Sequence, residues 1–326
     1  MKRIIGLTFS ILLFLEAGLL VVNLATANPV GSEAGYLPEL TIKSDGTIAF
    51  YEQPPPYEES PAPEVIHRTG NVYTLTADVE GYSVRIDCSN IVFDGAGHTI
   101  YASSGFINSG LRLLDVTDVT VKNVEVAGNS YTSIFLVGSN CQITNVKTQK
   151  DFRVNGDGLN AITESSLNGL VLWQGNNVIS KCNISRIFVN DRSGSNIFTQ
   201  NNFLCDNSTD ERLIGVCSAN FWDNGSLGNY WSNYLTEYPN ASEIGNTGID
   251  NTPYVIDENN VDYYPLMYPY DIENDTIAFP TPEPQPEPEP FPTAPVAAAS
   301  AASIGLVGVG VLVYFRKRKR QAPAAS

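Results

Sequence analysis

The chain of 326 residues has a net charge of −16 at pH 7, and its length allows one sizeable domain with attached segments. Between two apolar ends, residues 28–295 carry 12 basic and 34 acidic side chains, a net charge of −22. Such a surface excludes nucleic acid as a partner, because phosphate binding requires lysine and arginine. Divalent cations or neutral glycans suit it better, although the charge also fits a role in solubility alone.

The first 27 residues predict a secretory signal peptide. A charged start, Met1-Lys2-Arg3, precedes an apolar run over 4–24, and Ala25-Thr26-Ala27 has the small-x-small pattern of a cleavage site. Because the apolar run is long, an uncleaved N-terminal anchor is the alternative. In either case the bulk of the chain is exported.

Residues 28–69 predict an irregular N-terminal segment that caps the domain. One or two strands are expected over 36–51, whereas the prolines at 54–56, 61 and 63 break any regular element. A stack of strands leaves unpaired edges and an open core at its first coil, which must be covered. We assign this role to residues 36–80.

Residues 70–204 repeat one short pattern about five times, at roughly twenty residues per copy. A few apolar residues are followed by a polar turn rich in Asn, Asp, Ser and Gly, and then by a second apolar piece. The first pieces are 84–86, 111–114, 134–137, 170–172 and 187–189, and the second pieces are 91–93, 119–121, 141–143, 178–179 and 197–198. Pieces this short and rich in β-branched residues predict strands, so each copy is one coil of a parallel β-helix. A β-sandwich is the alternative, but it requires no pattern of fixed period.

Residues 90–100, NIVFDGAGHTI, resemble the opening coil of the NosD-like, CASH-type right-handed β-helix family of carbohydrate-binding proteins and sugar hydrolases. The segments 228–234 (GNYWSNY), 251–256 (NTPYVI) and 260–267 (NVDYYPLM) resemble the part that closes many archaeal members. The resemblance covers about 70–270 and implies an all-β, right-handed parallel β-helix, the pectin-lyase-like solenoid. It implies the fold well and the function poorly, because one fold hosts many activities.

The copper delivery linked to NosD itself is not expected here. Copper sites use His, Met or Cys ligands. The chain offers only His67 and His98, together with Met267 as its one methionine after the initiator.

The longest gap between copies, about 149–168, predicts a projecting loop, and such loops of solenoids often carry binding residues. Within it, the segment 155–158 (NGDG) faintly resembles an Asn-x-Asp segment of β-helix galacturonases, whose Asp-Asp pair, Gly-His-Gly and Arg-x-Lys are missing here. Hydrolysis requires two carboxylates set across the bond, a spacing that a sequence does not give. Asp151, Arg153 and Asp157 are therefore the first candidates for catalysis, and an ordinary surface loop is the alternative.

Five cysteines in an exported chain allow disulfides. Cys205 and Cys217 bracket a polar insertion just past the last coil and are the best candidate pair, a staple on the C-terminal cap. Cys141 falls in a predicted strand and is expected in the core. Cys88 and Cys182 either pair or stack inside, and an odd number leaves one cysteine without an intrachain partner.

Residues 205–272 predict a C-terminal cap rich in aromatic residues. If the rings are buried, they cover the last coil. If they are exposed, Trp222, Tyr230, Trp231 and Tyr234 form a platform on which sugar rings stack. We favour the cap, because the open end of the core requires apolar cover.

Calcium is the only cofactor that the sequence leaves open. Asp250 lies in the segment 246–250, where relatives in the resembling family carry an Asp-rich, calcium-like loop. Calcium prefers several oxygen ligands, mostly carboxylates, and this segment has lost most of them. No metal or other cofactor is therefore predicted, and Asp250 is only a weak candidate for a calcium ligand.

Export also makes N-glycosylation plausible. Chance alone would give a similar number of Asn-x-Ser/Thr sequons at this composition. The candidates are Asn183, Asn207, Asn224, Asn240 and Asn274.

The C-terminal part predicts a stalk and a membrane anchor. Residues 273–294 are predicted to be the stalk, and the stretch 280–292 within it alternates proline with mostly acidic residues, which makes a stiff, extended spacer. Residues 295–315 form an uncharged helix that spans a bilayer core of about 30 Å. The basic run 316–320 places the tail 316–326 in the cytoplasm by the positive-inside rule.

These predictions describe a single-pass protein of the cell surface with an extracellular domain. The first hypothesis is a non-catalytic module that binds carbohydrate or contributes to the envelope, because no complete catalytic set is recognised. The second is a polysaccharide lyase or glycoside hydrolase acting on extracellular polymers through Asp151, Arg153 and Asp157. The third is a purely structural envelope protein. The expected partners are the membrane and extracellular glycans or envelope proteins.

Overall fold

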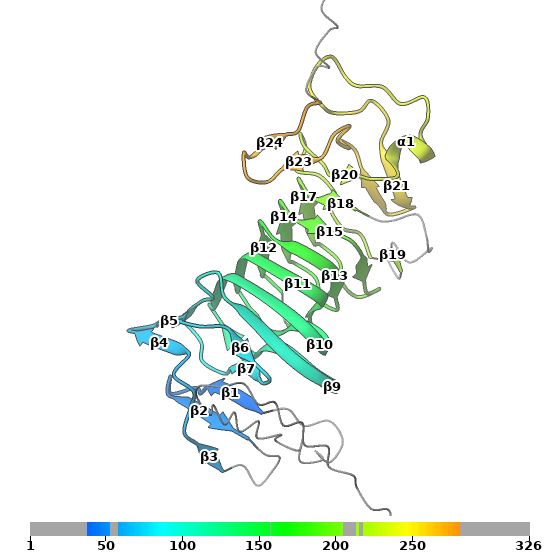
Figure 1. Cartoon of the computed structure of the whole chain (residues 1–326). Coiled ribbons are helices and arrows are strands. Elements are labelled where there is room, and N and C mark those ends of the chain that lie inside the picture. Colours follow the sequence, from blue (N-terminus) through cyan, green and yellow to red (C-terminus); the bar gives the residue numbers. More distant parts are fainter. Residues whose placement is uncertain (1–37, 53–57, 157, 205–212, 215–217, 281–326) are drawn as a thin grey trace, which may run out of the picture. The chain divides into compact units, whose positions relative to one another are not determined.

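The structure is a computed structural model that describes residues 38–52, 58–156, 158–204, 213–214 and 218–280 (Figure 1). Their strands belong to one compact unit of the chain. Figure 1 shows short strands stacked coil upon coil, with hairpins at the N-terminal end and an irregular cap at the C-terminal end.

Several predicted segments lie outside the described residues: the signal peptide at 1–27, the membrane helix at 295–315 and the tail at 316–326. No helix in the described part of the chain is long and apolar enough to cross a membrane. The predicted start of the stalk at 273 is wrong, because the chain turns back after Asp271 and Ile277 is buried. The folded domain therefore continues to residue 279.

The strands form three parallel rows, which together make a β-helix of about six turns. The first row contains β1 (Glu39–Ile42), β7 (Ser83–Ile86), β16 (Ile187–Val189), β19 (Leu213–Ile214) and the C-terminal parts of β9 (Thr99–Thr117), β10 (Thr120–Ser139), β11 (Gln142–Val154) and β13 (Ser166–Leu172). The second row contains β5 (Val72–Leu75), β8 (Val92–Asp94), β12 (Ala161–Thr163), β14 (Val178–Ser180), β17 (Ile197–Thr199) and the first residues of β10 and β11. The third row contains β6 (Val79–Glu80), β15 (Asn183–Ile184), β18 (Asn202–Phe203), β20 (Tyr230–Trp231), the first residues of β9 and β13 and the middle parts of β10 and β11. Parallel pairing in all three rows confirms the predicted all-β parallel β-helix and excludes the β-sandwich, whose sheets are antiparallel.

The interior of the β-helix is a stack of apolar side chains. In the first row the inward positions are Val84, Leu111, Ile134, Phe152, Leu170 and Ile187, none of which is more than 2% exposed. Burying a side chain of this size stabilises the fold by about 1.5–3 kcal/mol. Because side chains alternate across a strand, the residue that follows each of these positions on its own strand points outward.

The loop predicted at 149–168 is wrong, because these residues form a further coil. β11 runs on to Val154, β12 adds a strand to the second row, and β13 begins at Ser166. Phe152 and Ile162 are fully buried and fill the same places in the core as the apolar pieces of the neighbouring coils. The repeat is hard to see here because Phe152 and Val154 alternate with charged residues and do not form a run of consecutive apolar residues as in the other coils.

The N-terminal segment covers the first coil, and the strands expected over 36–51 are present as β1 and β2. β1 pairs in parallel with β7 and antiparallel with β2 (Ile48–Tyr51), which in turn pairs with β3 (Glu59–Ser60). β4 (Ile66–Thr69) forms a hairpin with β5. The first row therefore ends in an antiparallel hairpin rather than in an open parallel edge.

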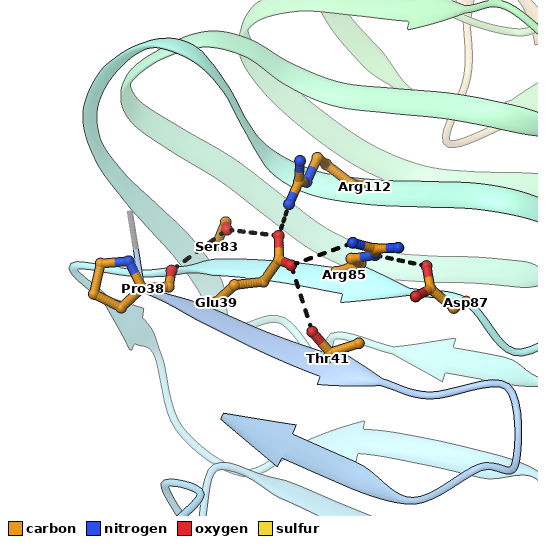
Figure 2. Close-up of polar contacts among 7 residues, drawn as sticks. All are labelled: Pro38, Glu39, Thr41, Ser83, Arg85, Asp87 and Arg112. Atoms are coloured by element: carbon orange, nitrogen blue, oxygen red, sulfur yellow. Dashed lines mark hydrogen bonds and ion pairs between the residues drawn. The ribbon is translucent and has the colours of Figure 1, made fainter. Parts of the chain in front are cut away.

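A buried carboxylate fastens β1 to the coils (Figure 2). Glu39 is only 6% exposed, and its carboxylate accepts hydrogen bonds from Thr41 and Ser83. It also forms ion pairs with Arg85 and Arg112, which belong to β7 and β9. Arg85 pairs in addition with Asp87 at 2.7 Å. We call Glu39, Arg85 and Arg112 the Glu39 cluster.

Two ladders of buried amide side chains connect the later coils. In each step of a ladder, a backbone N–H donates to the side-chain oxygen of the next coil. The first ladder contains Asn160, Asn177, Asn196, Asn220 and Asn260. The second contains Asn201, Asn229 and Asp262. Both ladders end in β22 (Asn260–Asp262), which lies in the C-terminal cap.

The cap consists of α1 (Tyr234–Glu237), β21 (Tyr254–Asp257), β22, β23 (Tyr270–Asp271) and β24 (Thr276–Ile277). Its rings continue the core, because Trp222 stacks on Phe198 and Trp231 stacks on Phe203, each with ring centroids 4.3 Å apart. Trp222, Trp231 and Tyr234 are 1%, 3% and 2% exposed. A buried ring offers no face to a sugar, so the glycan platform fails for these three residues, and Tyr230 beside them is half-buried.

Candidate functional site

The outer surface of the first row carries a group of charged and aromatic side chains. The register places Thr41, Arg85, Arg112, Phe135, Arg153, Val171 and Phe188 in one outward column, one residue per coil. We use the name arginine-aromatic face for its later part and the side chains around it, namely Tyr131, Asp151, Arg153, Trp173, Arg186 and Phe188.

Asp151 lies at the centre of this face between two guanidinium groups. Its Oδ1 lies 2.9 Å from Nη2 of Arg186, and its Oδ2 lies 3.3 Å from Nη2 of Arg153. Gly169 leaves the space for this arrangement, because a Cβ at that position would collide with Oδ1 of Asp151. Both carboxylate oxygens are therefore held in ion pairs.

Arg153 is fixed by Tyr131 as well as by Asp151. Its guanidinium carbon lies 4.6 Å from the centre of the Tyr131 ring, and Nη2 lies 3.3 Å from the tyrosine hydroxyl. Its Nε–H group is buried and has no hydrogen-bond partner among the described residues. Arg186 is more open, with a side chain 52% exposed.

A small pocket opens beside the Asp151 ion pairs. It has a volume of about 200 Å³, and Asp151, Gly169, Arg186 and Phe188 contribute to its lining. Apart from the bond to Asp151, the N–H groups of Arg186 have no partner in the described part of the chain. The pocket therefore presents unused guanidinium donors.

A larger pocket of about 420 Å³ lies next along the strands, and Trp173 forms one side of it. Trp173 is 40% exposed, and its ring lies 5.8 Å from that of Phe188, which lines the smaller pocket. The polar residues of the lining are Asn155, Gln174, Asn190, Asp191 and Arg192. Within the described ranges, the side-chain polar atoms of Asn155, Gln174, Asp191 and Arg192 bond to no other protein group. They remain available to a ligand.

Asp151 does not offer a free carboxylate to an acid–base pair for hydrolysis. A catalytic pair requires two carboxylates on opposite sides of a bond, and Asp151 is instead engaged on both oxygens by arginine. The structure does bring Asp151 and Arg153 together, as neighbours on one outward strand face. Asp157, the third candidate, lies outside the described residues.

The weak calcium candidate, Asp250, is buried in the cap. It is 1% exposed, its Oδ1 accepts a hydrogen bond from the backbone N–H of Thr252, and its Oδ2 has no partner among the described residues. The described residues contain no group of three or more His, Cys, Asp and Glu side chains that could hold a metal ion.

Of the cysteines, Cys141 is buried as expected, while Cys88 and Cys182 are free thiols and do not pair with each other. Burial raises the pKa of the Cys182 thiol to about 12, so it is an unreactive core residue. The proposed pair of Cys205 and Cys217 lies outside the described residues.

The predicted sequons differ in access. Asn224, Asn240 and Asn274 are exposed, whereas Asn183 is half-buried and its side-chain oxygen accepts a hydrogen bond from Asn202. Asn207 lies outside the described residues.

Sequence reasoning missed the residues that shape the two pockets, chiefly Trp173, Arg186 and Arg192. A signal existed, because Trp173-Gln174 directly follows a predicted strand and therefore lies where that strand leaves the core. The candidates for catalysis were Asp151 and residues near it, whereas Trp173, Arg186 and Arg192 lie on the neighbouring coils. Comparison of the chain with protein-family models, with curated proteins and with solved structures finds no match.

Proposed function

We propose that the protein is a non-catalytic module of the cell surface that binds carbohydrate at the arginine-aromatic face. The observation that carries this proposal is Trp173, a large ring exposed in a pocket where the side chains of Asn155, Gln174, Asp191 and Arg192 bond to no other described group. Ligand pockets measure about 300–1,000 Å³, and they combine apolar walls with a few polar groups. A pyranose ring fits such a site, since its C–H face stacks on an aromatic ring and its hydroxyls bond to polar side chains.

The proposed location follows from the ends of the chain. The signal peptide at 1–27 exports the domain, and a stalk that begins after the folded domain separates it from the helix at 295–315. The membrane is then one partner through this single-pass anchor, with the tail at 316–326 in the cytoplasm. The opening and closing motifs support membership of the right-handed NosD-like, CASH-type family, as an archaeal surface glycoprotein whose other partners are glycans or envelope proteins.

A polysaccharide lyase or glycoside hydrolase is the alternative that uses Asp151, Arg153 and Asp157. The ion pairs of Asp151 argue against it, because a general base requires a free oxygen to take a proton. A purely structural envelope protein would leave the Trp173 pocket without a role.

The test is a glycan array probed with the full-length protein in mild detergent, with and without calcium. We expect binding to at least one glycan, and Trp173→Ala should weaken it at least tenfold, since stacking is lost. Tyr101→Ala is the matched control, because Tyr101 is 44% exposed on β9, away from both pockets. A blank array, or equal binding by the Trp173 variant, would sink the proposal, and cleavage of a bound polymer would favour the enzyme.

A further inference from the structure

The two pockets differ in chemistry, and this difference describes the ligand. We infer that the arginine-aromatic face binds an anionic oligosaccharide, with a carboxylate or sulfate group at Arg186 and another sugar ring on Trp173. The inference rests on the proposed function and adds the charge of the ligand to it.

The pockets lie side by side along the strand direction. Asn155, in the larger pocket, follows Asp151, in the smaller one, by four residues of nearly extended chain, which corresponds to about 13 Å. This separation exceeds one pyranose ring, so a single oligosaccharide reaches both pockets. The contact between Trp173 and Phe188 makes the surface between them continuous.

The charge of the face is opposite to that of the domain. On the face, Arg153 and Arg186 stand against Asp151, a net charge of +1. Arg192 and Asp191 of the larger pocket cancel, whereas the total for residues 28–295 is −22. An anion is repelled by most of this domain, and field lines from the arginines concentrate at the pockets. Guanidinium groups also bind carboxylate and sulfate oxygens through paired N–H groups.

The Glu39 cluster shows what a closed version of the same arrangement looks like (Figure 2). Thr41 and Arg153 belong to the same outward column. Each has a carboxylate two residues before it, Glu39 and Asp151 respectively. At Glu39, two hydroxyl groups complete the contacts of the carboxylate, and the arginine side chains are 34% and 25% exposed.

The Asp151 group is open by comparison. Among the described residues no hydroxyl bonds to Asp151, and Arg186, which lines a pocket, has a side chain that is 52% exposed and makes no hydrogen bond beyond the one to Asp151. A structural ion-pair cluster has no need of unused donors that face a cavity. Donors of this kind are what an anionic ligand requires.

The experiment compares the full-length protein with Arg186→Gln on an array of neutral, carboxylated and sulfated oligosaccharides. We expect the wild type to bind carboxylated or sulfated glycans. The affinity should fall as salt rises from about 50 to about 300 mM, because added salt shortens the Debye length and screens the attraction between arginine and the anion. Arg186→Gln should weaken this binding at least tenfold. Lys147→Gln is the control, because it removes one positive charge from another ion pair whose lysine side chain is 61% exposed and lies outside both pockets. EDTA should have no effect on binding, because the anionic group of the glycan contacts arginine directly and not through a metal cation.

Three outcomes overturn the inference while the proposed function stands. These are binding restricted to neutral glycans, binding of acidic glycans that Arg186→Gln leaves unchanged, and binding that requires calcium. A blank array for every class removes the proposed function itself, and the inference with it. The two failures are therefore distinguished in one experiment.

Discussion

Asp262 shows how a single residue closes the β-helix. Its Oδ2 accepts hydrogen bonds from the backbone and side-chain N–H groups of Asn229 and from Nε1 of Trp231, and its Oδ1 accepts one from the backbone N–H of Tyr264. Asp262 is fully buried. Burial outweighs these bonds and raises the pKa of the carboxyl to about 7. Gly228 leaves room for it, because a Cβ there would collide with Oδ1.

This raised pKa predicts a pH dependence of stability. Between pH 4 and 7 the folded state holds a proton on Asp262 that the unfolded state has already lost. The free energy of unfolding therefore falls as the pH rises over this range, and the contribution of the bound proton is gone once the pH passes 7. The loss is on the order of 4 kcal/mol. Urea unfolding of the wild type and Asp262→Asn from pH 4.5 to 8 measures it, since the difference in unfolding free energy between the two should change with pH. Parallel curves would contradict the raised pKa.

The amide ladders are the corresponding feature at the scale of the elements. Oδ1 of Asn260 accepts hydrogen bonds from the backbone N–H of Asn220 and from Nε1 of Trp222, both at 3.0 Å. Its Nδ2 donates to Ser218 and Asp257. β22 therefore fastens the cap to the last coils through side chains, where strand pairing has ended.

Asn260→Ala should destabilise the domain by about 2–6 kcal/mol, because it leaves two buried N–H donors unsatisfied at about 1–3 kcal/mol each. Asn259→Ala is the matched control. Asn259 is exposed, and its side chain has no bond among the described residues, so its loss should cost under about 0.5 kcal/mol. Chemical unfolding of both variants measures the difference, and equal losses would refute the role of the ladder.

Prediction from the sequence succeeded where one residue type determines a local conformation. Asn90, Asn140 and Asn176 have φ values of +54° to +61°, and the polar turns predicted these bends. The extra coil at 149–168 was missed because Phe152 and Val154 alternate with charged residues, whereas the repeat was recognised from runs of consecutive apolar residues such as 187–189. The ladders were not predictable, because they depend on which asparagines meet across coils of unequal length, and only the stacked register determines this.

At the scale of the whole molecule, a solenoid is nearly one-dimensional, because each coil contacts only its neighbours. The Glu39 cluster and the cap around β22 therefore protect two separate ends. The arginine-aromatic face lies on coils between them. Its residues come from β10, β11 and β16 and from the positions just after β13 and just before β16, so side chains that are far apart in the sequence are brought together by the stack. For this reason the pockets could not be read from any one motif.

Glu39→Gln tests the independence of the two ends. Leaving the charges of Arg85 and Arg112 without their buried partner should cost about 3–5 kcal/mol at the N-terminal end. Hydrogen exchange should then rise in β1 and β2, while β13 and β16 keep their protection. Glu59→Gln is the control, since this glutamate is 55% exposed in its pair with Lys43 and should contribute at most about 1 kcal/mol. A uniform loss of protection would show one cooperative unit instead.

The termination of both ladders in β22 has a consequence for the order in which the protein is made. Coils can stack as they leave the ribosome, each one on the coil synthesised before it. Asn220 and Asn229, however, receive their last acceptors only from Asn260 and Asp262. Translation must therefore advance some thirty to forty residues beyond the last stacked strands before the end can shut. A nascent chain halted in that interval keeps its coils but leaves its final aromatic layer uncovered.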